Sequence, residues 1–101
     1  MHLVEILLPV RDNEGRRFAA RKFAGVREEL TERFGGVTTF TRAPAHGTNE
    51  SDGSVQHDDI VIFEIMTLTL DREWWVSYRR GLEHRFAQDE IVIRASTIER
   101  L

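Results

Sequence analysis

Cysteine is absent from the 101 residues, and proline occurs only twice. Without a thiol, disulfides, iron–sulfur clusters, thiolate metal sites and cysteine nucleophiles are excluded. There is no run of about 18 apolar residues, so we expect no transmembrane helix. A net charge of −3 gives no overall attraction to nucleic acid or to anionic lipid. These features favour an intracellular, cytoplasmic protein with no nucleic-acid partner and no membrane partner.

The sequence motifs of common enzyme classes are also missing. There is no glycine-rich phosphate loop, no helix with paired histidines and no serine-centred elbow. The sequence therefore identifies no catalytic residue and no cofactor, and whether the protein is an enzyme stays open.

The composition is that of one folded domain. Hydrophobic residues make up 41% of the chain and charged residues 31%, as in ordinary globular proteins. A chain of this length can bury roughly 65% of the surface that its unfolded form would expose. We therefore expect residues 1–101 to form a single domain.

Hydrophobic periodicity predicts six elements of secondary structure. Alternating or β-branched runs favour strands over 2–10, 37–41, 59–70 and 90–101. Apolar residues at spacings of three and four predict helices near 18–34 and 72–88, with Gly35-Gly36 ending the first and Asp71 capping the second. The order β-α-β-β-α-β predicts an α+β, ferredoxin-like fold. Its antiparallel sheet would run 4-1-3-2, with both helices on one face.

The dipeptide Asp52-Gly53 is suited to a two-residue hairpin turn between the second and third strands. Such a turn places Thr41 opposite Glu64 and Phe40 opposite Ile65. Phe40 would then point toward the helices, as would Ile65. A shift of one residue would exchange the two faces, so this register fixes which side chains each face receives.

Two histidines lie near the tip of that hairpin, together with two aspartates: His46, His57, Asp58 and Asp59. A metal site needs ligands that are held in place by a second layer of hydrogen bonds, which a hairpin tip seldom provides. We therefore expect no metal site in this segment.

Strand alternation sorts the remaining side chains onto the two faces of the sheet. Those expected to face the helices are Val4, Ile6, Leu8, Val61, Phe63, Ile65, Ile91, Ile93 and Ala95. Those expected on the opposite, open face are Leu3, Glu5, Leu7, Thr39, Thr41, Ile62, Glu64, Met66, Val92, Arg94 and Ser96. The open face is too apolar to remain in water, and a second copy of the chain is the simplest cover. The sequence thus predicts a homodimer.

Glu5, Glu64 and Arg94 are the polar exceptions in the middle of this face. Two carboxylates beside one guanidinium could bind a polar small molecule or act as an acid–base pair. The alternative is a cross-strand ion pair that only fixes the pairing of the strands. With Thr41 beside them, these residues are the candidate ligand site. They also argue against RNA binding, which requires stacking aromatic side chains at the positions of Glu5 and Glu64.

Other conspicuous residues have structural explanations. On a helix, neighbouring side chains point about 100° apart, so Trp75 can enter the core while Trp74 lies at its border. Docking of another molecule on Trp74 is the alternative. Basic residues on both helices are balanced by glutamates, which predicts solvated helix surfaces.

Three runs, "LTERFGGVTTFTRAPAHG", "DDIVIFEIM" and "YRRGLEHRFAQDEIVIRA", resemble a family of small, uncharacterised bacterial proteins of ferredoxin-like shape. The resemblance implies the fold and a bacterial, cytoplasmic origin, but no activity. More loosely, the shape is similar to dimeric α+β barrel proteins. Three hypotheses remain: a dimer that binds a small ligand at the open face, an enzyme with Glu5 or Glu64 as general base, and a protein-interaction module.

Overall fold

The computed structural model describes residues 1–42 and 59–101. Six elements follow one another in this part of the chain: β1 (His2–Pro9), α1 (Ala20–Phe34), β2 (Thr38–Arg42), β3 (Ile60–Thr67), α2 (Arg72–Arg85) and β4 (Val92–Thr97). Each coincides with a predicted element apart from a few residues at its ends. The α+β class and the order of the elements are confirmed.

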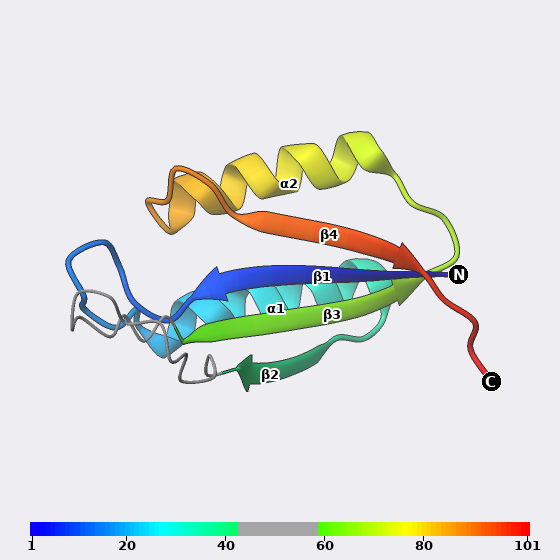
Figure 1. The fold of residues 1–101 in the computed structure, drawn as a ribbon, viewed down its shortest axis with the longest axis horizontal. Coiled ribbons are helices and arrows are strands. Elements are labelled where there is room, and N and C mark those ends of the chain that lie inside the picture. The colour runs from blue at the N-terminus through cyan, green and yellow to red at the C-terminus, as the bar shows by residue number, and fades with distance from the viewer. Residues whose placement is uncertain (43–58) are drawn as a thin grey trace, which may run out of the picture.

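The four strands form one antiparallel sheet in the order β2-β3-β1-β4. This is the predicted order 4-1-3-2 counted from the other edge. In Figure 1, α1 lies behind β1 and β3 while α2 runs along the side of β4, and no helix of the described residues crosses the near face of the sheet. The arrangement is consistent with the expected ferredoxin-like fold, and within residues 1–42 and 59–101 one face of the sheet carries no helix.

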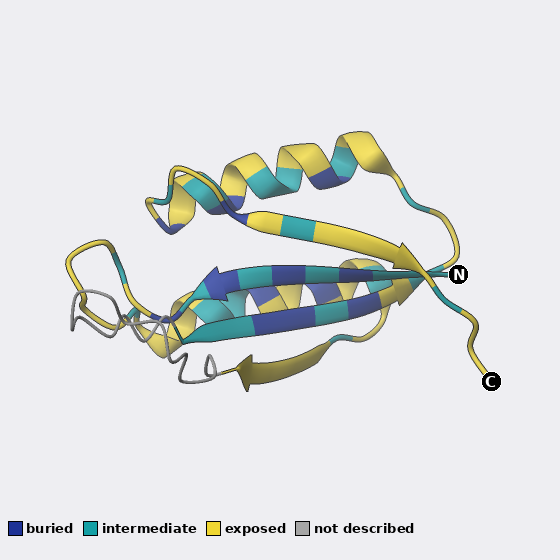
Figure 2. Cartoon of the chain, viewed as in Figure 1, coloured by how far each residue is buried: buried dark blue, intermediate teal, exposed yellow. Residues whose placement is uncertain are grey.

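Buried residues lie mainly in the two central strands β1 and β3 and at intervals along both helices (Figure 2). Alternate side chains of β1 are buried, as the strand pattern predicts. They form one cluster with residues of β3, of both helices and of the connection between α2 and β4: Val4, Ile6, Leu8, Val26, Leu30, Phe63, Ile65, Trp75, Leu82, Phe86 and Ile91. Both helices are therefore held to the sheet by the same apolar cluster.

The edge strand β4 is less covered than its alternation predicts. Its register places Ala95 opposite Val4, on the helix side, yet Ala95 is exposed. Five of the six residues of β4 are exposed. An edge strand has a neighbour on one side only, so alternation along it does not guarantee burial.

Local signals explain where the helices begin and end. The Asp71 carboxylate accepts a hydrogen bond of 3.1 Å from the backbone N–H of Trp74, which satisfies a free donor at the start of α2. Gly35, with a φ of 83°, ends α1 in the left-handed conformation that glycine adopts without strain. Both sequence predictions are confirmed.

The two helices are also joined by a polar contact. One oxygen of Glu29 accepts hydrogen bonds from the Tyr78 hydroxyl at 3.0 Å and from Arg85 at 2.7 Å. Burial raises the pKa of Tyr78, and the negative charge of Glu29 raises it further. The hydroxyl therefore stays protonated and remains a donor at neutral pH.

The adjacent tryptophans occupy the positions predicted for them. Trp75 belongs to the buried cluster, and Trp74 packs against it. Trp74 stacks on Tyr78 with ring centres 4.8 Å apart, and the Arg33 guanidinium lies 4.1 Å above the Trp74 ring. These neighbours occupy the faces of Trp74 on which another ring would stack.

The register of β2 differs from the prediction. Thr38, not Thr41, lies opposite Glu64, and Phe40 lies opposite Ile62 rather than Ile65. A shift of three residues is odd, so every side chain of β2 is on the other face from the one expected. All five residues of β2 are exposed, so burial fixes its register only weakly. The turn at Asp52-Gly53, from which the prediction came, lies outside the described residues.

Candidate functional site

Four polar side chains form a row across all four strands on the open face. Thr38 lies opposite Glu64, Glu64 opposite Glu5, and Glu5 opposite Arg94. Directly opposite residues of antiparallel strands share a face, with Cβ atoms roughly 4.5–5.5 Å apart. The structure therefore brings together Glu5, Glu64 and Arg94, as the sequence predicted. We call these four residues the polar row.

Arg94 is bonded to Glu5 within the row. Its Nε donates a hydrogen bond of 3.1 Å to Oε1 of Glu5. The Glu5 side chain is 20% exposed and that of Arg94 is 52% exposed. The anion is thus largely shielded from water, while its cationic partner at the sheet edge can still reach another molecule.

Glu64 lies beside this ion pair. Partial burial raises the pKa of Glu64, and the neighbouring Glu5 raises it further through a hydrogen bond and through its negative charge. Glu5 and Glu64 are directly opposite residues of neighbouring strands, so their carboxylates repel each other when both are ionised. A bound cation or a proton at Glu64 would relieve that repulsion.

Apolar side chains border the polar row on the side of the β1 C-terminus. Phe40 lies opposite Ile62, Ile62 opposite Leu7, and Leu7 opposite Val92. We call these four residues the apolar row. Ile62 is only 1% exposed although no described helix covers it, while Phe40 and Val92 are 39% and 45% exposed. Ile62 lies between Leu7 and Phe40, so its same-face neighbours account for its burial.

An open groove continues the apolar row toward the end of β1. It has a volume of about 730 Å³, and its lining includes Leu7, Ile60 and Val92 from the sheet. Polar side chains join the lining from the connections at this end, among them Asp12, Asn13 and Gln88. The volume falls in the range typical of small-molecule sites, about 300–1,000 Å³.

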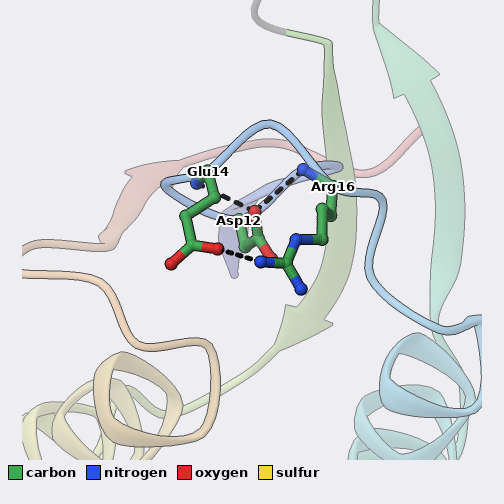
Figure 3. A network of polar contacts seen from close by, with 3 residues as sticks. All are labelled: Asp12, Glu14 and Arg16. Atoms are coloured by element: carbon green, nitrogen blue, oxygen red, sulfur yellow. Dashed lines mark hydrogen bonds and ion pairs between the residues drawn. The ribbon is translucent and has the colours of Figure 1, made fainter.

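One wall of the groove is a loop that its own hydrogen bonds hold in shape (Figure 3). Oδ1 of Asp12 accepts hydrogen bonds from the backbone N–H groups of Glu14 at 2.9 Å and Arg16 at 2.8 Å. The side chains of Glu14 and Arg16 form an ion pair across the loop. The side-chain amide of Asn13 donates to the carbonyl of Ala87 at 3.0 Å and so ties the loop to the turn that follows α2.

Sequence reasoning missed this loop as part of a site. The polar run "RDNEG" indicated only where the first strand ends. A usable signal was present, because an aspartate followed closely by glycine favours turns in which the carboxylate binds nearby backbone N–H groups. Nothing in the run indicated that the turn would border the open face.

The corrected register changes one candidate residue. Thr41 lies opposite Val61, on the other face of the sheet from Glu64, so it is not part of the row. Thr38 takes the position that was predicted for Thr41, and the predicted placement of Thr41 beside Glu64 is wrong.

The predicted hairpin tip lies outside the described residues, including His46, His57 and Asp58. Within 1–42 and 59–101, no three histidine or acidic side chains gather as a metal site would require. No helix in this part of the chain is both long enough and apolar enough to cross a membrane.

Comparison with known proteins identifies fold relatives only. No family model matches the sequence, and no curated protein matches it. Two solved structures are similar, and both are of a phage SAM lyase. The complex with S-methyl-5'-thioadenosine has a TM-score of 0.63 and 13% identity over 94% of this chain and 79% of the other. The apo form has a TM-score of 0.61 and 12% identity over 94% and 78%. At this identity the likeness shows a shared fold.

Proposed function

We propose that the open face of the sheet binds a small ligand with a positively charged group and an apolar or aromatic part. The observation that carries the proposal is the direct pairing of Glu5 with Glu64 in a row that contains a single guanidinium. The proposed ferredoxin-like fold supports it, because no helix of the described part of the chain lies over this face. The resemblance to a bacterial, cytoplasmic family is part of the same proposal and adds no activity.

The charges of the row favour a cation. Arg94 already donates its Nε hydrogen bond to Glu5, so the row keeps one negative charge in excess near Glu64. An opposite charge within about 4–6 Å favours the ionised form of a carboxylate and is attracted by it. The surrounding apolar side chains reduce the screening by water and strengthen this attraction.

The apolar row and the groove would hold the rest of the ligand. Leu7 and Val92 lie two positions along their strands from Glu5 and Arg94, roughly 7 Å at about 3.3 Å per residue. A molecule of nucleoside size can span that distance. Its charged group would then lie at Glu64 and its flat part over Leu7 and Val92, with the Asp12 loop beside it.

The structural relatives suggest two probes that share one nucleoside. S-adenosylmethionine, the compound in the name of the lyase, is a sulfonium cation that also carries an amino-acid group. S-methyl-5'-thioadenosine is a neutral thioether with the same nucleoside and without that group. A site that recognises the positive charge should distinguish the two. The shared fold at 13% identity supports the choice of probes, and the polar row supports the expected preference.

Calorimetric titration with the two probes and a panel of small amines tests the proposal. We expect a cationic probe to bind, the neutral thioether to bind at least about tenfold more weakly, and Glu64→Gln to remove the difference. Glu28→Gln is the control, because it makes the same chemical change at an exposed site on α1. Equal binding of cations by the wild type and by Glu64→Gln would contradict the proposal.

A second candidate is an enzyme in which Glu64 transfers a proton. The raised pKa of Glu64 favours it, since a general acid or base works best with a pKa near the working pH. If the protein is such an enzyme, the wild type should convert a cationic compound to product. Glu64→Asp keeps the charge but shortens the side chain, so it should retain binding and lose turnover. Binding without turnover in the wild type would exclude this candidate for that compound.

A further inference from the structure

The open face combines apolar surface with an ordered set of charges. Met66 is 50% exposed and Val92 45%, and both lie on this face beside the polar row. Leu3 and Leu7 flank Glu5 on the central strand β1. No helix of the described residues covers these side chains, and apolar patches of this kind usually mark a contact surface.

The order of charges in the polar row restricts how a second copy could cover this face. Glu5 lies on β1, with Glu64 on one side and Arg94 on the other, one strand away in each direction. Both possible two-fold axes lie in the plane between the two sheets. An axis perpendicular to the strands would place Glu64 on Glu64 and Arg94 on Arg94. An axis that runs over β1 and along it reverses the row, so Glu64 meets Arg94 of the second copy. Glu5 then lies opposite Glu5 of the second copy, and each keeps the hydrogen bond from Arg94 of its own chain. Only the second arrangement joins opposite charges.

The apolar side chains fit the same arrangement. With the axis along β1, Leu3 and Leu7 meet their own copies and Ile62 meets Val92. Facing sheets usually cross at about 30°, which places the axis within roughly 15° of the strands. Apolar contacts on either side would then enclose the charged contacts.

We infer that a second copy of this chain covers the open face, turned about an axis that runs close to the strands, so that Arg94 of each copy lies against Glu64 of the other. The exposed half of the Arg94 side chain is free for this contact while its Nε stays on Glu5. Each copy thus supplies the cation that the Glu64 of the other copy lacks in its own row.

This arrangement is compatible with the proposed ligand site and does not depend on it. Two facing rows bring together four carboxylates and two guanidinium groups, so two negative charges remain in excess. A cationic ligand would still be attracted to the space between the sheets. Because the pair forms from charges and apolar contacts of the chain itself, it can be tested without ligand.

Mixing two charge-reversed variants tests the contact directly. The wild type should scatter light as about twice 11.7 kDa. Glu64→Arg places two cations together in each contact and Arg94→Glu two anions, so each variant alone should dimerise at least about tenfold more weakly. An equimolar mixture should restore the dimer, because both contacts then join opposite charges. A contact within one chain cannot produce this rescue.

A monomeric wild type would overturn the inference, as would single variants that stay dimeric or a mixture that stays monomeric. Circular dichroism first establishes that both variants fold. If Arg94→Glu does not fold, a cross-linking experiment replaces the mixing experiment. Facing sheets lie about 10 Å apart, too far for a disulfide, so Leu7→Cys is treated with a short bis-maleimide. We expect a cross-linked dimer from Leu7→Cys and none from the exposed control Ser77→Cys on α2, and the absence of a Leu7→Cys product overturns the inference.

The two proposals can fail separately. A dimer that binds no cationic probe removes the ligand proposal and leaves this inference standing. A monomer that binds a cation through Glu64 removes this inference and leaves the ligand proposal standing.

Discussion

The two faces of the sheet use alternate residues of the same strands for different purposes. On the helix side, Val4, Ile6 and Phe63 are almost completely buried and need no explanation beyond packing. On the open side, Glu5 and Glu64 occupy the middle of the two central strands, where burial of charge is costly. A sequence under selection for stability alone would place apolar or hydroxyl residues there. The difference is the reason for proposing that the open face contacts another molecule.

The open face nevertheless contains a small apolar centre of its own. Ile62 is as inaccessible as the core residues, and its neighbours on the face are Leu7 and Phe40. The face is therefore partly organised before any partner or ligand arrives, and the charged side chains of the row project from an apolar surface.

The largest expected effect tests the helix-side core. Phe63→Ala removes a side chain with no exposed surface, and such changes cost about 3–5 kcal/mol. Urea denaturation measures the loss of unfolding free energy. Met66→Ala on the open face, half exposed, should cost less than about 1 kcal/mol in the monomer at high dilution. Similar losses at the two positions would mean that the faces do not differ in packing as described.

A smaller effect tests the register of β2. In the observed register Phe40 covers Ile62 on the open face, so Phe40→Ala should cost roughly 1–2 kcal/mol, about the value of partial burial. In the wild type, methyl NMR spectra should show contacts from the Phe40 ring to Ile62, and the substitution should remove them. Thr39→Ala is the control on the opposite face. A loss as large as that of Phe63→Ala, with NMR contacts to Ile65, would restore the register expected from the sequence.

The sequence predicted the parts of this structure that follow from local chemistry and strong burial. Asp71 and Gly35 marked helix ends, and alternation in β1 and β3 assigned the faces of Glu5 and Glu64. Arg94 followed from the same argument although β4 is exposed. The register of β2 could not be predicted, because the only large apolar residue of that strand, Phe40, packs on the open face rather than in the core. The assumption that it faced the helices removed Thr38 from the site and introduced Thr41.

The smallest expected effect concerns the pH dependence of stability. The pKa of Glu64 is raised in the folded chain by burial first and by Glu5 second. A raised pKa means that folding favours the protonated acid. The stabilising contribution is therefore complete below the ordinary pKa of 4.5 and is lost as the pH rises through the higher folded value. Glu64→Gln does not titrate and resembles the protonated form, so it should stabilise the chain at pH 7.

We expect that gain to be below about 1 kcal/mol, because the group is partly exposed and water screens its interactions. Urea midpoints at pH 7 and near pH 4, at a dilution where scattering shows single chains, give the measurement. The advantage of Glu64→Gln should shrink toward zero at the lower pH. Glu28→Gln, at an exposed position on α1, should change stability little at pH 7. An advantage that grew as the pH fell would show that Glu64 is stabilised as an anion in the single chain, and that Arg94 or another cation of the same chain already serves it.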